Sequence, residues 1–471
     1  MAFGAFLGGI LGALWRERRY SAEQIRDHRH EQLRKLIVHA RKHSDFWRAR
    51  LEHIELEAPI NLAQIEPVTK AELMDNLSDT IAEPQISKET IESWAMQPSN
   101  AGRPFAKNMV LASTSGTTGR VGYFVKYARD IARMNGILMA RILRDRLIPR
   151  ELIRFSFGRR YRMAMVVATG GHFISHILGG FRPWPSRAFV KLQSFSIMNR
   201  LDKVVCDLNR FRPHYLHGYP TFLEALAHEK LNGRLAIDPE FISLGSEPFS
   251  LTARRAIVTA FPRAQLSETY GATECLAIAN QCSAGHLHVN EDVVILEPVD
   301  KKGRPVALGV ASDKILITNL MSFAQPILRY ELTDSVIIDG EDCPCGSPMT
   351  RIRVEGRSDD TLYLEDDHSQ VHAFPPVPFE ALMLGINGLR QYQLVHRTQN
   401  HLQLSIVKDE VVETKLLKTR INTAMIRFFE ERGIGRNLQL NIEVVDEISR
   451  DPVSHKIRQI YSQVPPPERC A

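Results

Sequence analysis

Residues 113–120 read Ser113-Thr114-Ser115-Gly116-Thr117-Thr118-Gly119-Arg120, a run of hydroxyl and glycine residues closed by an arginine. Small residues let backbone N–H groups close around phosphate oxygens, hydroxyls add donors and the arginine supplies positive charge, so the segment is suited to hold a triphosphate. The Gly-Lys-Ser/Thr ending of a Walker motif is absent. Taken alone, a flexible hydroxyl-rich turn explains the segment equally well.

A second informative segment follows about 150 residues later and reads Glu268-Thr269-Tyr270-Gly271-Ala272-Thr273-Glu274. The tyrosine ring beside a glycine offers a stacking surface for a base, and the threonine hydroxyl suits an α-phosphate. The carboxylate of Glu274 suits Mg²⁺ on a triphosphate. By itself, a Tyr-Gly pair is more often only a turn.

The two segments in this order resemble the adenylate-forming superfamily of acyl-CoA synthetases and related ligases. Further segments resemble the phenylacetate-CoA ligase branch of that superfamily over most of the chain. These segments are residues 31–51, 67–73, His217-Gly218-Tyr219-Pro220-Thr221, 244–250, Arg329-Tyr330-Glu331-Leu332-Thr333-Asp334, 343–346 and 356–360. The family's Arg-Tyr-x-Thr-Gly-Asp motif has Leu-Thr here in place of Thr-Gly.

The resemblance implies ATP-dependent activation of a carboxylic acid, expected to be aromatic, as an acyl-AMP. It implies that Ser115, Gly116, Thr117 and Gly119 bind the nucleotide, that Thr118, Thr273 and Glu274 lie near the phosphates and Mg²⁺, and that Gly245, Glu247, Tyr270 and Gly271 frame the adenine. Asp334 and Arg357 correspond to the family's ribose contacts, and Asp359 to its hinge. Lys456 corresponds to a lysine that neutralises charge in the transition state, although His455 stands where the family has glycine; an ordinary surface lysine is the alternative.

The periodicity of the chain predicts the same architecture. Ser21 with Gln24 predicts a capping box, and the spacing of apolar residues predicts one amphipathic helix from 21 to about 51. Between 105 and 340, short apolar runs such as 241–244, 293–296 and 314–320 alternate with helical patterns such as 254–260, which predicts an α/β domain. After 360, strands at 402–406 and 438–444 flank a helix at 411–432 that ends at Gly433. We therefore expect an α/β large N-terminal domain (1–357) of the adenylate-forming type and a small mobile α+β C-terminal domain (358–471).

Three cysteines and a histidine form a candidate metal site: Cys282, His288, Cys343 and Cys345. Two thiolates one residue apart, together with a Cys-x5-His pair, suit a tetrahedral zinc ion. Because no ligand position would stay open, such a zinc would be structural. His286 is a competing ligand, and four unconnected reduced residues are the alternative.

Bulk properties narrow the class of protein. The net charge of +6 is spread along 471 residues and interleaved with acidic residues, which does not indicate a nucleic-acid partner. Six cysteines make no disulfide framework, so a reducing, cytoplasmic setting is the default. The apolar stretch 1–14 is too short to span a membrane. Residues 1–19 are expected to dock on the protein's own body, with contact to a membrane surface as the alternative.

The resemblance stops after the hinge. Residues 361–375 keep Phe374-Pro375 but lack the Arg-Gly turn that lies near the pantetheine channel of thioester-forming relatives. This difference leaves the acceptor open among the thiol of coenzyme A, the thiol of an acyl carrier protein and an amine. Transfer of the nucleotide itself, or a sensor without turnover, are further hypotheses. Loops near 123–127, 215–220 and 244–270 are expected to line the acid pocket, with the aromatic residues Tyr123, Phe124, Tyr127, Tyr215 and Tyr219, which are also ordinary core residues.

Overall fold

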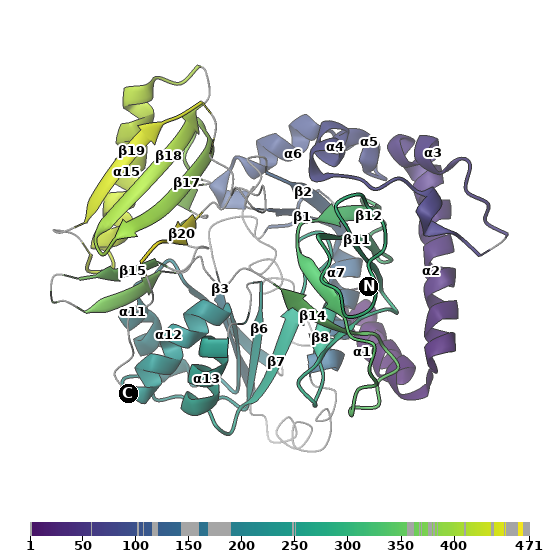
Figure 1. Ribbon diagram of the computed structural model, residues 1–471, viewed down its shortest axis with the longest axis horizontal. Helices are drawn as coiled ribbons and strands as arrows, with labels where there is room; N and C mark the ends of the chain where they lie inside the picture. Colours follow the sequence, from purple (N-terminus) through teal and green to yellow (C-terminus); the bar gives the residue numbers. More distant parts are fainter. Residues whose placement is uncertain are drawn as a thin grey trace.

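The structure is a computed structural model of the chain (Figure 1). It describes residues 2–57, 59–100, 103–106, 108–114, 121–142, 160–167, 190–246, 249, 251–355, 362–366, 368, 370–374, 379, 382–383, 385–408, 411–434, 438–446, 448 and 460–464. Among these residues, none of the helices combines the length and the apolar composition that crossing a lipid bilayer requires.

The helices and strands of the described residues alternate through the middle of the chain. The helices are α1 (Ala2–Arg19), α2 (Ala22–His43), α3 (Asp45–Leu51), η1 (Leu62–Gln64), α4 (Lys70–Asp75), α5 (Leu77–Thr80), α6 (Lys88–Ala95), η2 (Pro98–Asn100), α7 (Ala128–Ile142), α11 (Leu201–Phe211), α12 (Pro220–Leu231), α13 (Leu251–Ala260) and α15 (Thr414–Glu430). The strands are β1 (Met109–Ser113), β2 (Tyr123–Tyr127), β3 (Tyr161–Val167), β4 (Val190–Ser196), β5 (Tyr215–Gly218), β6 (Phe241–Gly245), β7 (Gln265–Tyr270), β8 (Ala279–Gln281), β9 (Leu287–Val289), β10 (Val294–Val299), β11 (Lys314–Asn319), β12 (Ile327–Leu332), β13 (Ser335–Ile338), β14 (Arg351–Glu355), β15 (Leu362–Glu365), β16 (Val371–Phe374), β17 (Leu389–Thr398), β18 (His401–Lys408), β19 (Gln439–Val444) and β20 (Ile460–Ser462).

The central element is a nine-stranded sheet with the order β13-β14-β9-β8-β7-β6-β5-β3-β4. Strands β3 to β7 run parallel, and β8, β9, β14 and β13 continue the sheet with antiparallel pairing. Successive residues of a strand face opposite sides of a sheet. Accordingly, Leu216 and Ile242 pack under α11, α12 and α13, whereas Tyr215 and Phe241 pack against Ile142 of α7 on the other side. The predicted α/β class is confirmed.

The N-terminal helices differ from the prediction in one respect. The capping box of Ser21 and Gln24 is present, but the predicted single helix ends at His43 and a new one begins at Asp45. Ser44 adopts an extended backbone, caps the N–H of Trp47 and donates from its hydroxyl to the carbonyl of Asp79. The expected docking of residues 1–19 is confirmed, since α1 packs along α7 through Ala13.

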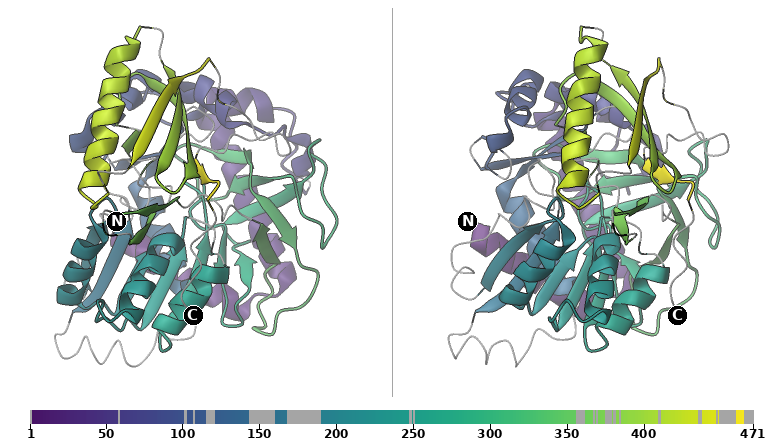
Figure 2. Two further views of the ribbon diagram at one scale, coloured as in Figure 1. Left: turned by 60° about the vertical axis from the view of Figure 1, so that its left-hand side comes forward. Right: turned by 90° about the vertical axis from the view of Figure 1, so that its left-hand side faces the viewer.

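The C-terminal region has a core of its own. A four-stranded sheet with the order β19-β18-β17-β20 packs on α15, and β15 and β16 form a separate hairpin (Figure 2). Most large side chains of this core come from residues 362–460, with Met198 packed against it. The strands predicted at 402–406 and 438–444 and the helix predicted at 411–432 correspond to β18, β19 and α15. Strand β17, which pairs with both β18 and β20, was not predicted.

Candidate nucleotide and metal sites

The segments singled out in the sequence meet at the carboxyl ends of parallel strands. His217 and Gly218 end β5, Gly245 ends β6, and Tyr270 ends β7, with Gly218 opposite Leu244 and Gly245 opposite Thr269. In open α/β sheets, ligands bind beyond this edge, where loops are free to vary. The sequence order of the motifs therefore becomes a spatial cluster.

Several predicted site residues lie outside the described residues. They are Ser115, Gly116, Thr117, Thr118, Gly119, Glu247, Arg357, Asp359 and Lys456. The base of the first loop is described, however. Thr114 and Gly122 exchange hydrogen bonds, because Thr114 N–H donates to Gly122 O (2.9 Å) and Gly122 N–H donates to the hydroxyl of Thr114 (3.0 Å). Strands β1 and β2 thus bring residues 114 and 122 together at a hairpin end.

Tyr270 and Asp334 are brought together from segments 64 residues apart. The phenol of Tyr270 donates a hydrogen bond of 3.0 Å to the carboxylate of Asp334. Burial, followed by the Asp334 charge, raises the pKa of Tyr270, so the phenol keeps its proton. Gly271 allows the close turn that follows, because a Cβ there would lie 2.3 Å from the carbonyl oxygen of Leu276. A proposed adenine contact and a proposed ribose contact therefore adjoin.

Glu274 is held on both its backbone and its side chain. Its carbonyl oxygen accepts hydrogen bonds from Lys126 Nζ (3.0 Å) and Asn319 Nδ2 (2.9 Å), and its Oε1 accepts one from the phenol of Tyr330 (3.0 Å). Burial raises the pKa of Glu274, since only 4% of the residue is exposed. Lys126 and Asn319 therefore hold the backbone of Glu274, and Tyr330 holds its carboxyl group. A cation bound nearby would lower the pKa of this carboxyl group and so favour its ionised form.

Two cations near Glu274 were not recognised in the sequence, whereas Tyr330 belongs to the motif 329–334. Lys126 is buried on β2, and this burial lowers the pKa of its amine. A charged residue between Val125 and Tyr127 in an otherwise apolar strand is the one signal that pointed to it. Lys70 is a second missed cation, because its charge acts on Glu274 and its side chain adjoins Gly122.

In the Cys/His cluster, Cys282 directly follows β8, His288 lies on β9, and Cys343 and Cys345 lie in the loop before β14. The Sγ atoms of Cys282 and Cys343 lie 3.7 Å apart, and Sγ of Cys345 lies 3.5 Å from Nε2 of His288. The four candidate ligand atoms all lie within 4.8 Å of one another, and His288 is the histidine of this group. Around a tetrahedral zinc, two sulfurs would be separated by about 3.8 Å and a sulfur and a nitrogen by about 3.5 Å.

The surroundings of the cluster fit a cation. Nδ1 of His288 lies 2.7 Å from the carbonyl oxygen of Met349 and donates to it, which leaves the lone pair of Nε2 facing Cys345. The five cysteines among the described residues are all free thiols.

The aromatic residues expected at the acid pocket are mostly core residues. Phe124, Tyr215 and Tyr219 are 4% exposed or less, and Phe124 makes an edge-to-face contact with Tyr330. Tyr127 donates to Glu83. A small cavity adjoins α7 and is lined by Lys126, Asp130 and Phe323, among others, but by no part of Tyr270, Gly271 or Asp334. The described residues therefore do not define the acid pocket.

Comparison with known proteins places these features in context. No protein-family model matches the sequence. The sequence is 28% identical over 224 residues to phenylacetate-coenzyme A ligase of Thermus thermophilus, a match that covers 45% of this chain. The chain thus matches about half (48%) of the length of that curated relative.

The solved structures of 2-hydroxyisobutyryl-CoA ligase share the fold over nearly the whole chain. The form with 2-HIB-AMP and CoA in the thioesterification state has a TM-score of 0.57 at 18% identity and covers 95% of this chain and 91% of that one. An open form with the same two ligands has a TM-score of 0.54 at 18% identity and covers 93% and 91%. The chain therefore has the adenylate-forming ligase fold, and the resemblance of its sequence to phenylacetate-CoA ligase is confirmed.

Proposed function

We propose that this protein uses ATP to activate a carboxylic acid as an acyl-adenylate and then transfers the acyl group to the thiol of coenzyme A. The observation that carries the proposal is the hydrogen bond between Tyr270 and Asp334 at the carboxyl end of β7. It unites two motifs that the sequence links to adenine and ribose, in a fold shared with a ligase solved with 2-HIB-AMP and CoA.

The chemistry assigns separate tasks to the site residues. Glu274 would hold Mg²⁺ on the triphosphate, together with Thr118 and Thr273 near the phosphates. Gly245, Glu247 and Gly271 would frame the adenine, with Arg357 beside the ribose. Lys456 would stabilise the charge that builds between the attacking carboxylate and the α-phosphate. The small C-terminal domain would begin near residue 358 and rotate about Asp359, which would bring Lys456 in for the first step and withdraw it for the second.

The substrate and acceptor are finer parts of the proposal. An aromatic acid is favoured by the similarity to phenylacetate-coenzyme A ligase. Coenzyme A is favoured by its presence in the solved relatives, and an acyl carrier protein is the alternative thiol. The free thiols fit the cytoplasmic setting that we propose.

Pyrophosphate exchange tests the first half of the reaction. Wild-type protein is incubated with ATP, Mg²⁺, labelled pyrophosphate and one acid at a time from a panel of aryl, indolyl and fatty acids. We expect exchange with aryl acids and a loss of roughly 10²- to 10³-fold in Lys456→Ala, because one preorganised charge contact in the transition state is removed. Lys415→Ala, at an exposed lysine of α15, is the matched control and should keep the wild-type rate.

Each result separates the alternatives. Exchange followed by thioester formation with coenzyme A supports the whole proposal, whereas exchange that yields product only with a carrier protein or an amine replaces the acceptor. No exchange with any acid would leave a nucleotide-binding sensor. Equal exchange in Lys456→Ala and wild type would remove Lys456 from its role.

We also propose that Cys282, His288, Cys343 and Cys345 bind one structural zinc ion. The two separations at the cluster match a tetrahedral Cys3His site, and the hydrogen bond from His288 to Met349 orients the ring. Elemental analysis of purified protein should give one zinc per chain, reduced to a small fraction in Cys343→Ser. Cys206→Ser, at an exposed cysteine, should keep the full content. Zinc content that is unchanged in Cys343→Ser, or absent from wild type, would contradict the assignment.

A further inference from the structure

Helix α1 is fixed to the protein by direct backbone contact. A Cβ on Gly9 would lie 2.2 Å from the carbonyl oxygen of Arg133, and a Cβ on Gly136 would lie 2.1 Å from that of Phe6. Neither position leaves room for a side chain, so α1 and α7 touch through their main chains (Figure 1). Ala13 is fully buried at the same contact.

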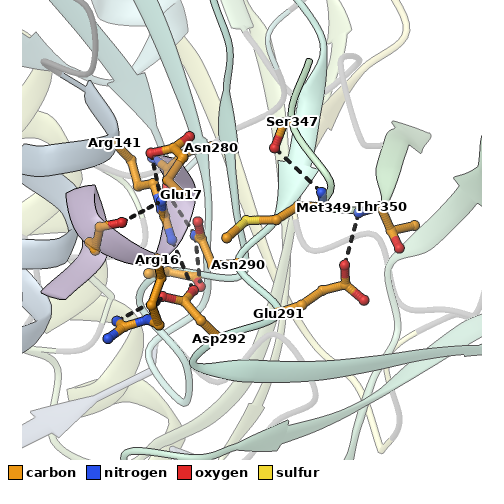
Figure 3. Close-up of polar contacts among 12 residues, drawn as sticks. Arg16, Glu17, Arg141, Asn280, Asn290, Glu291, Asp292, Ser347, Met349 and Thr350 are labelled. Carbon is orange, nitrogen blue, oxygen red and sulfur yellow. Dashed lines mark hydrogen bonds and ion pairs between the residues drawn. The ribbon is translucent and has the colours of Figure 1, made fainter. Parts of the chain in front are cut away.

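A buried ion network fixes the rotation of α1 about its axis (Figure 3). Asp292 has no exposed side-chain surface and accepts from Arg16 at 2.8 Å and from Arg141 at 3.0 Å. Arg141 also pairs with Glu17 at 2.6 Å, where both side chains are about 5% exposed or less. Turning α1 to bury another face would break these pairs and leave charges unpaired inside the protein, which is strongly unfavourable.

The face that this arrangement turns outward is apolar. Leu7, Leu11 and Trp15 follow each other at four-residue spacing and are 39%, 65% and 56% exposed. Residues four apart lie on one face of a helix, so the three side chains form a stripe, which we call the α1 stripe. Single exposed apolar residues are common on protein surfaces. An aligned set of three, held outward by a buried ion network, instead indicates a surface that contacts a partner.

The exposed charges of α1 itself have one sign. Because Arg16 and Glu17 are used in the buried network, the exposed charges of α1 are Arg18 and Arg19 in its last turn. A helix with leucine and tryptophan on one face and arginines at its edge has the composition of a helix that lies in a lipid interface. Trp15 suits the boundary between headgroups and acyl chains, because its ring is apolar and its N–H donates.

We infer that the α1 stripe docks this protein on an anionic phospholipid surface, with Leu7, Leu11 and Trp15 entering the interface and Arg18 and Arg19 meeting the headgroups. A second copy of the chain is a poorer fit, because three side chains supply far less than the roughly 1,200 Å² that a specific protein interface buries. A lipid surface requires no shape complementarity and adds attraction for each nearby arginine.

Vesicle flotation with the full-length chain tests this inference. Protein is mixed with vesicles of phosphatidylcholine alone or of phosphatidylcholine and phosphatidylglycerol at a 3:1 ratio. We expect binding to the anionic vesicles at least tenfold stronger than to the neutral ones. The double variant Leu11→Gln, Trp15→Gln should lose at least tenfold of that binding. Arg18→Gln, Arg19→Gln should lose roughly five- to thirtyfold and remove the preference for anionic lipid.

Matched controls separate docking from a general loss of structure. Leu308→Gln, Val310→Gln changes two apolar residues that are 66% and 50% exposed on another loop and should bind like wild type. All variants should keep the wild-type unfolding midpoint, since each changes exposed side chains. Unchanged binding in the Leu11, Trp15 double variant, or equal binding to both kinds of vesicle, would overturn the inference. A concentration-dependent dimer that disappears in that variant would assign the stripe to a second copy instead.

Discussion

A largely buried aspartate lies at each end of helix α7, Asp130 at the N-terminal end and Asp292 at the C-terminal end. The pKa values of the two carboxyl groups are shifted in opposite directions. At the C-terminal end, burial would raise the pKa of Asp292, but Arg141 and Arg16 together lower it below its ordinary value. At the N-terminal end, burial raises the pKa of Asp130 to about 6 despite the nearby cations Arg129, Arg133 and Lys126.

The difference lies in how closely cations contact each carboxylate rather than in burial. Both oxygens of Asp292 accept from guanidinium groups at 3.0 Å or less. Oδ1 of Asp130 lies 3.6 Å from Arg129, and its Oδ2 has no hydrogen-bond partner among the described residues. The pair teaches that a buried carboxyl group of this protein keeps a lowered pKa where cations donate hydrogen bonds to both of its oxygens. The first end is a structural clamp for α1, whereas the second faces the cavity beside Lys126.

The largest effect should come from neutralising the clamp. Asp292→Asn should lower the free energy of unfolding by about 3–5 kcal/mol, because Arg16 loses its buried partner and Arg141 keeps only Glu17. Urea unfolding followed by circular dichroism measures the change. Asp27→Asn, at an exposed residue of α2, is the matched control and should stay within about 0.5 kcal/mol of wild type. Similar losses in the two variants would show that Asp292 is not a clamp.

Contacts between neighbours in the chain could be predicted from the sequence, whereas contacts between distant residues could not. Features set by neighbours in the chain were predicted, such as the capping box at Ser21 and Gln24 and the apolar run 241–244, which forms most of β6. The break at Ser44 was not predicted; its hydroxyl caps the N–H of Trp47 and also donates to the distant carbonyl of Asp79. The nucleotide motifs are recognisable because their residue types and order are distinctive. The partners of Glu274 and Asp292 are not, because each pairing joins residues 45 or more positions apart.

A smaller effect, of opposite sign, should come from Asp130→Asn. An ionised Asp130 lacks directed donors, so its removal should stabilise the protein by roughly 1–2 kcal/mol at pH 7.5. The shift from 3.8 to about 6 sets an upper limit of about 3 kcal/mol, which the partial exposure of the side chain (19%) and the contact with Arg129 reduce. The measurement is the same urea titration, with Asp27→Asn again as the control.

The pH dependence of that difference identifies its cause. Between pH 4 and 6 the folded protein keeps the Asp130 proton while the unfolded chain releases it, so wild-type stability falls as pH rises through this window and this contribution is constant above it. The gain from Asp130→Asn should therefore be small at pH 4, grow up to pH 6 and then level off. Asp292 contributes in the reverse direction, and only below about pH 4, because its pKa is lowered. A gain for Asp130→Asn that is equal at pH 4 and pH 7.5 would mean that side-chain packing, rather than a buried charge, distinguishes this end of α7.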